Sequence, residues 1–226
     1  AFARDADELA TRARMIEVAA GLGWLSPDEK RFELARMFGD RINGSNVGVV
    51  DVDLACALNH NHALDGERER IRIGAAQAEK IAPAALLACL GSAEARSRVL
   101  RALGSADDDE MRIVQTYLHY RPLDEAGELR DVAGAVLRMN APGAQVRALE
   151  TLASYRLSDR ETLEGLARLY SRAKSLDVQR AVAGVLIRSD TTGIAAPALA
   201  RLLRAHRLKS PDGADVIDIL IRRLSS

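Results

Sequence analysis

Residues 128–190 read ELR DVAGAVLRMN APGAQVRALE TLASYRLSDR ETLEGLARLY SRAKSLDVQR AVAGVLIRSD, and this stretch decides the fold. Four segments with helical spacing of apolar residues are separated by short breaks at residues 140–143, 158–159 and 173–175. Arg147 and Arg180 each precede an alanine and a bulky aliphatic residue, and they lie 33 positions apart. Because one helix pair cannot bury its apolar face alone, paired helices with a period of about 20–50 residues predict a stacked array.

The same period extends beyond this stretch. The sequence Leu-Ala-Arg-Leu occurs at residues 166–169 and again at 199–202, which is 33 positions later. Met111-Arg112 corresponds to Val146-Arg147 at a spacing of 35. We therefore expect three full helix pairs from about residue 124, the last over residues 193–206 and 212–224. Repeat character begins near Ser92.

Two short motifs carry a family resemblance. Arg101-Ala-Leu-Gly104 resembles the end of a repeat's second helix, and Val146-Arg147 resembles the start of one. Over about residues 92–224 the chain is similar to the HEAT-like repeats of bacterial proteins. The resemblance implies an all-α fold, a right-handed α-α superhelix preceded by a less regular helical block. We predict that residues 1–91 form an N-terminal cap on an array formed by residues 92–226.

The N-terminal block also has helical patterns. Apolar residues spaced three or four apart predict a helix over about residues 5–20, ending at Gly21-Leu-Gly23. Ser26-Pro27-Asp28-Glu29 predicts the start of a second helix, because serine and glutamate can satisfy each other's backbone amides and proline suits the first helical position. Trp24 is expected to wedge between these two helices.

Further along, residues 47–50 read as an extended linker and residues 54–58 as a short helix. A helix is then expected from Gly66 to Ile81, with Pro83 and Gly91 dividing a longer helix from a shorter one. Cys56 and Cys89 lie in apolar helical runs. They are expected to be free, buried thiols; the alternative is a single disulfide, which would imply export.

Composition limits the classes of partner. Acidic and basic residues balance at 32 each and aromatic residues make up 4% of the chain, which disfavours nucleic acid. No apolar run approaches the roughly 20 residues of a membrane span. All but four of the basic residues are arginines, as is typical of a GC-rich bacterial genome. The chain begins Ala1-Phe2-Ala3 without an initiator methionine, which leaves the bacterial cytoplasm and periplasm both open.

The chemical motifs are sparse. His60 and His62 with Asp65 are weak metal-ligand candidates, but a solvated loop at a helix end explains them more simply. Asp51 and Asp53 are expected to cap a helix rather than bind metal. The acids at 107–110 are expected to complement the partial positive charge of a helix N-terminus. The sequence contains none of the familiar catalytic motifs: GxxxxGK(S/T) for phosphate binding, GxSxG for a serine nucleophile, HExxH for a zinc protease, or paired CxxC. We therefore assign no catalytic residue and no cofactor, and favour a protein that is not an enzyme.

The favoured function is a scaffold or adaptor that binds a protein or peptide along the second helices of its pairs. Recurrent arginines can form an anion-binding ladder, or they can lock adjacent repeats by reaching carboxylates, which we favour. A nucleic-acid-binding repeat protein and an enzyme with a site near residues 51–65 stay as alternatives. The candidate partner-binding residues are Arg112, Arg147, Tyr155, Arg156 and Arg180.

Overall fold

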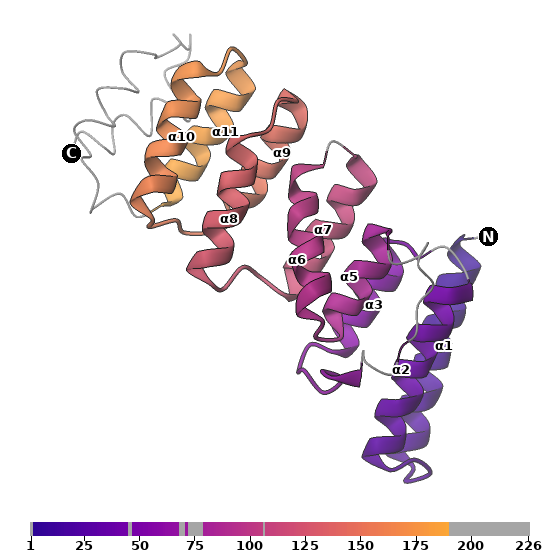
Figure 1. Cartoon of the computed structure of the whole chain (residues 1–226). Helices are drawn as coiled ribbons and strands as arrows, with labels where there is room; N and C mark the ends of the chain where they lie inside the picture. Colours follow the sequence, from indigo (N-terminus) through magenta and orange to yellow (C-terminus); the bar gives the residue numbers. More distant parts are fainter. Residues whose placement is uncertain (1, 45–46, 68–70, 72–78, 106, 190–226) are drawn as a thin grey trace. The chain divides into compact units, whose positions relative to one another are not determined.

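A computed structural model describes residues 2–44, 47–67, 71, 79–105 and 107–189 (Figure 1). Within these residues every regular element is helical, so the predicted all-α class is confirmed. The helix pair predicted over 193–224 and most of the helix predicted between Gly66 and Ile81 lie outside them. None of the described helices is both long and apolar enough to cross a bilayer. The chain divides into two compact units: residues 1–102 with 108–122, and residues 103–107 with 123–226.

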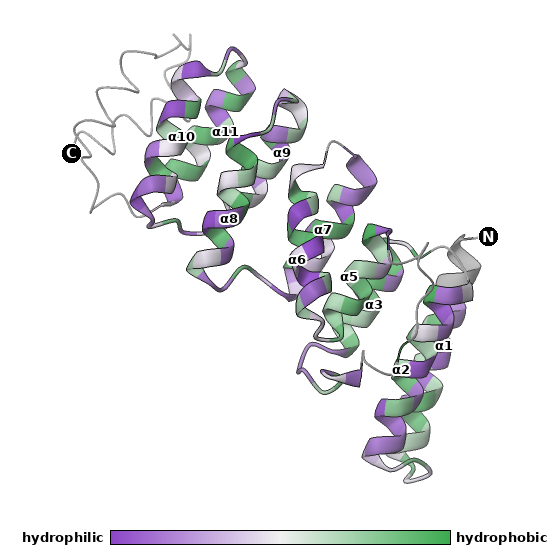
Figure 2. Cartoon of the chain, in the orientation of Figure 1, coloured by the Kyte–Doolittle hydropathy of each residue, from purple (hydrophilic) through white to green (hydrophobic). Residues whose placement is uncertain are grey.

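The first unit is built around a helix that is apolar on all sides. This helix, α5, spans Ile81–Cys89, and all its residues from Ala82 onward are buried. It carries no charge and four alanines, so α3, α6 and α7 can approach it closely, and Figure 2 shows its continuous apolar character. Its neighbours in the unit are α1 (Phe2–Gly21), α2 (Pro27–Gly44), α3 (Val49–Leu58), α6 (Ala93–Arg101) and α7 (Asp108–Tyr120).

The predicted capping box at the start of α2 is confirmed. The Ser26 amide donates to Glu29 Oε2 over 2.8 Å, and the Glu29 amide donates to Ser26 Oγ over 3.3 Å. These hydrogen bonds from Ser26 lower the pKa of the Glu29 carboxyl. The local sequence is sufficient here, because both partners lie within one helical turn.

The prediction for Trp24 was wrong, since its side chain is 75% exposed. Gly23 adopts a left-handed conformation with φ +74°, and the Trp24 amide donates back to the Ala19 carbonyl over 2.9 Å. This is a Schellman ending, in which glycine supplies the positive φ that other residues resist. The motif closes α1 with Trp24 on its outer end, away from the space between α1 and α2.

The start of α3 also differs from the prediction, because Val49 and Val50 are helical rather than part of an extended linker. Asp51 lies at the third helical position and accepts a hydrogen bond from the Gly48 amide over 2.8 Å, as a helix-capping carboxylate does. Its other oxygen accepts from Arg41 Nε over 2.8 Å, and both side chains are at least nine-tenths buried. This pair starts the helix earlier than the apolar pattern indicates.

The expectation of two free thiols was wrong as well. Cys56 of α3 and Cys89 of α5 form a disulfide, with their Cα atoms 4.8 Å apart and both residues fully buried. The two helices cross at these positions, a juxtaposition that depends on the packing of residues 33 apart in sequence.

The described part of the second unit, up to residue 189, contains two helix pairs in two layers. The elements are α8 (Ala126–Leu137), α9 (Pro142–Leu152), α10 (Arg160–Arg172) and α11 (Leu176–Arg188). The first helices, α8 and α10, pack on each other, as do the second helices, α9 and α11. Within each pair the two helices also pack together.

A buried glutamine closes each pair in the same way. Gln145 in α9 and Gln179 in α11 lie 34 positions apart, and each side-chain amide donates to two carbonyls at the end of the preceding helix. The last carbonyls of a helix have no partner within it, so an internal donor satisfies groups that burial would otherwise leave unpaired. The acceptors are Val136 and Met139 for Gln145, at 2.9 and 3.4 Å, and Tyr170 and Ala173 for Gln179, both at 3.2 Å.

Arginines near helix ends connect successive pairs. Arg172 donates to the Leu137 carbonyl over 2.7 Å, and Arg188 donates to the Ala153 carbonyl over 3.0 Å. Each contact spans 35 residues, from the end of one helix to the end of the corresponding helix one period earlier. A cation there also complements the partial negative charge of the helix C-terminus. In these two contacts between pairs the acceptors are backbone carbonyls.

We expect Gln145→Met to lower the free energy of unfolding by about 1–2 kcal/mol, because the carbonyls at the end of α8 lose their donor inside the unit. The replacement keeps the side chain's length. Urea unfolding followed by circular dichroism measures the change. Glu150→Ala, at an exposed position of the same helix, is the control and should change stability by less than about 0.5 kcal/mol. Equal effects of the two replacements would show that the glutamine does not close the pair.

Candidate functional site

An open groove of about 820 Å³ runs between α8 and α10, the first helices of the two pairs. Its lining includes two glycines, Gly134 and Gly165. A Cβ atom at Gly165 would come within 2.6 Å of Leu137 Cδ1, so glycine there leaves room for the Leu137 side chain to pack against α10. A Cβ atom at Gly134 would meet only Arg138 Nη1, at 3.4 Å. The groove exists because Gly134 leaves space that any other residue would occupy.

Two of the arginines lining the groove occupy equivalent positions. Arg138 directly follows α8, and Arg172 is the last residue of α10, 34 positions later. Arg172 uses one nitrogen to hold the Leu137 carbonyl. Arg138 is exposed and makes no ion pair within the described part of the chain. The two guanidinium groups therefore form a short ladder at the carboxyl ends of the helices, where cations are favoured.

Arg130 and Arg168 also line the groove, and both are held only weakly. Arg130 Nε lies 3.5 Å from Asp159 and its side chain is 57% exposed; Arg168 Nη1 lies 3.8 Å from Glu164 and is 65% exposed. Exposed ion pairs of this kind contribute only about 0–1 kcal/mol. An incoming anion can therefore replace the present carboxylate partners at little cost.

Asp159 itself has a structural role beside the groove. Its carboxylate caps α10, accepting hydrogen bonds from the Thr162 hydroxyl at 2.7 Å and the Thr162 amide at 2.8 Å. These bonds, with a smaller contribution from Arg130, lower the pKa of Asp159. The stabilisation by the ionised cap is therefore fully present at neutral pH, and it is lost as the pH falls through that lowered pKa.

The groove has the chemistry of a binding site. Its lining includes four arginines and two acids, Asp131 and Glu161, but no histidine, cysteine or serine. The one hydroxyl, that of Thr162, is already hydrogen-bonded to Asp159. No protein family, curated protein or solved structure matches the chain. The side chains themselves are therefore the guide to function, and the arginines offer hydrogen-bond donors for carboxylates.

The residues predicted for partner binding are distributed over both units. Arg180 borders a smaller hollow of about 360 Å³ between α9 and α11. Arg147 lies on α9 and is half-buried, while Tyr155 and Arg156 follow that helix. Arg112 is exposed on α7, in the other unit. Sequence reasoning missed the four arginines of the α8–α10 groove. Two of them, Arg138 and Arg172, could have been found from their 34-residue spacing.

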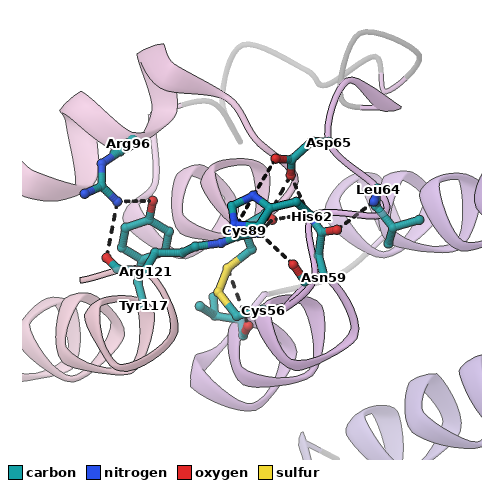
Figure 3. A network of polar contacts seen from close by, with 10 residues as sticks. Cys56, Asn59, His62, Leu64, Asp65, Cys89, Arg96, Tyr117 and Arg121 are labelled. Atoms are coloured by element: carbon teal, nitrogen blue, oxygen red, sulfur yellow. Dashed lines mark hydrogen bonds and ion pairs between the residues drawn. A yellow bond between two sulfur atoms is a disulfide. The ribbon is translucent and has the colours of Figure 1, made fainter. Parts of the chain in front are cut away.

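The histidine loop after α3 belongs to a polar network in the first unit (Figure 3). Arg121, at the end of α7, donates through Nη2 to the Asn59 carbonyl at 2.7 Å and to the Cys89 carbonyl at 3.2 Å. His62 Nδ1 lies 2.7 Å from Asp65 Oδ2, and the Arg121 guanidinium lies against the same ring. Arg121 Nη1 lies within hydrogen-bonding distance of both ring nitrogens of His62 and can donate to whichever of them carries no proton.

This arrangement disfavours metal binding by His60, His62 and Asp65. His62 and Asp65 hold each other and the Arg121 cation, whose charge opposes a metal ion, and His60 is exposed. Among the described residues no group of three or more His, Cys, Asp or Glu side chains gathers as a metal site requires.

Asp53 has a different partner. The Tyr120 hydroxyl donates to Asp53 over 2.9 Å, and this bond raises the pKa of Tyr120. With Asp51 bound to Arg41 and Asp53 bound to Tyr120, the carboxylates of the 51–65 segment stabilise the fold of the first unit.

Proposed function

We propose that this protein is a non-catalytic helical-repeat scaffold or adaptor that binds a protein or peptide partner. In this proposal the second unit is a segment of a HEAT-like, right-handed α-α superhelix. The contacts of Gln145 and Gln179 support it, because they recur 34 positions apart, and so do those of Arg172 and Arg188, each of which spans 35 residues. Stacked pairs present extended surfaces whose side chains vary without disturbing the core.

The observation that carries the binding proposal is the α8–α10 groove. It is large enough for several side chains of a partner, it is open to solvent, and four arginines surround it. Arginine is favoured at protein interfaces because its planar guanidinium can bind a carboxylate through two hydrogen bonds. We therefore place the partner on the first helices of the pairs, in place of the second helices that sequence reasoning favoured.

The Cys56–Cys89 disulfide favours an oxidising compartment over a reducing one. Disulfides persist in oxidising surroundings and are rare where thiols are kept reduced. We propose an oxidising compartment, which for a bacterial chain means the periplasm.

The test is capture of partners on the purified full chain, followed by mass spectrometry, at about 50 and 200 mM salt to vary the screening of charges. The bait is compared with Arg138→Glu and with Arg112→Glu, which makes the same charge change in the other unit. A protein retained through the higher salt, and lost with Arg138→Glu alone, supports the proposal. Retention of nucleic acid only, released by salt, would replace it with the nucleic-acid alternative.

A further inference from the structure

The groove between α8 and α10 has a charge pattern that selects its occupant. We propose that it binds an acidic peptide segment in which carboxylates alternate with apolar side chains; this inference rests on the proposed scaffold function. Four arginines line the groove against the two acids Asp131 and Glu161, although the whole chain carries equal numbers of acidic and basic residues. Asp159 and Glu164 already pair with Arg130 and Arg168, so the positive charge left for a ligand lies at Arg138 and Arg172, and a complementary segment must bring negative charge there.

The positions of the arginines suit carboxylates spaced along a chain. Arg138 and Arg172 occupy equivalent helix ends, so their guanidinium groups recur with the repeat itself. The Arg138 side chain makes no hydrogen bond or ion pair with the described residues, so its guanidinium can bind a ligand's carboxylate. Arg168 can exchange its weak contact with Glu164 for a partner's carboxylate. Together they offer charge-assisted, two-pronged hydrogen bonds at separate points.

Apolar side chains in the lining explain the second half of the proposed pattern. Leu137 and Met139 line the groove and are partly exposed, beside Leu169, which is buried. A peptide that presented only charge would leave Leu137 and Met139 in contact with water. A segment with leucine-like residues between its acids buries apolar surface there while its carboxylates reach the arginines, and burial of that surface contributes favourable free energy.

The same lining disfavours nucleic acid as the occupant. No tryptophan, tyrosine or phenylalanine borders the groove, so bases have no ring on which to stack. Asp131 and Glu161 would also face the continuous negative charge of a phosphate backbone, whereas a peptide can place a neutral residue opposite them.

The experiment measures fluorescence anisotropy of a labelled twelve-residue peptide, Glu-Leu-Glu-Ser repeated three times, titrated with the full chain at low salt. The comparison ligands are the same peptide with lysine in place of glutamate, and a single-stranded DNA of twelve nucleotides. We expect the acidic peptide to bind, the lysine peptide not to bind, and Arg138→Glu to weaken binding about tenfold or more. Arg112→Glu, an exposed arginine in the other unit, should change the affinity less than about twofold.

A variant that fills the groove without changing its charge tests the role of the groove's shape. Gly134→Leu places a side chain where only Arg138 lies nearby, so the fold accommodates it and the helix gains a better helix-forming residue. We expect an unchanged or raised Tm together with at least about tenfold weaker peptide binding, because the leucine occupies the ligand's place. Intact binding by this variant would overturn the proposal even if Arg138→Glu behaved as expected.

The outcomes separate this inference from the function on which it rests. Equal affinity of the Arg138→Glu and Arg112→Glu chains for the acidic peptide overturns the groove proposal, as does tighter binding of the DNA. If a captured partner is instead lost with Arg180→Glu, on the α9–α11 face, the scaffold function stands and the inference fails. If neither peptide binds and no protein is captured, both fail.

Discussion

Replacing Cys56 and Cys89 together with alanine is expected to lower the free energy of unfolding by about 3–4 kcal/mol. The disulfide closes a loop of 33 residues, and the entropy that such a crosslink removes from the unfolded chain corresponds to about that amount. Both cysteines are fully buried, so the alanines also leave small gaps between α3 and α5. Urea unfolding of the oxidised wild type and the double variant, followed by circular dichroism, measures the difference.

The reduced wild-type chain is the control for packing. If the crosslink is responsible, reduction should account for most of the loss, and the alanine replacements should add only the small packing cost. Hydrogen exchange should quicken in α3 and α5 and stay unchanged in α8–α11, which belong to the other unit. A total loss below about 1 kcal/mol would show that the crosslink contributes little to stability.

Replacing Arg121 with methionine is expected to cost about 3 kcal/mol. The Arg121 guanidinium is the donor that reaches two helix ends at once, through the Asn59 carbonyl after α3 and the Cys89 carbonyl of α5. Arg121 Nη2 also lies 3.7 Å from Asp65 Oδ1, and the replacement removes this cation from the Asp65 carboxylate. Methionine has a similar length but no donor, so the carbonyls lose their partner while most of the packing remains.

Two further variants define what Arg121 contributes. Arg121→Lys keeps the charge but offers a single nitrogen, so it should recover only part of the loss, because one ammonium cannot take both the place of Nη2 between the two carbonyls and the place of Nη1 against the His62 ring. Arg101→Met, at an exposed arginine near the end of α6, is the matched control and should cost less than about 0.5 kcal/mol. Losses of equal size at residues 101 and 121 would contradict the assigned role.

The sequence predicted correctly those elements that depend on close neighbours. The capping box of Ser26 and Glu29 has both partners within one turn, and each predicted break of the 128–190 stretch separates two observed helices. The apolar residues spaced for a helix also lie in the core, as Leu166 and Leu149 do. Asp51 was expected to cap the short helix. The start of α3 at Val49 was not predicted, because Arg41, ten residues earlier, holds the Asp51 carboxylate.

The candidate site was mostly beyond sequence reasoning. Arg112, Arg147 and Arg180 were singled out because they recur in similar local sequences. The α8–α10 groove depends on something else, the approach of Gly165 to Leu137, which lie 28 positions apart. Arginine is common throughout the chain, so composition could not distinguish those that border a groove from those that are merely exposed.

By itself, the sequence determined the helical class and most of the breaks between helices, because hydrogen bonds and apolar spacing within a few residues govern both. The tertiary structure alone decided that the two cysteines are bonded, that Trp24 faces solvent, and that Arg121 joins two helix ends. Each of these depends on the direction in which a side chain points once helices far apart in sequence have packed, and no local pattern contains that direction.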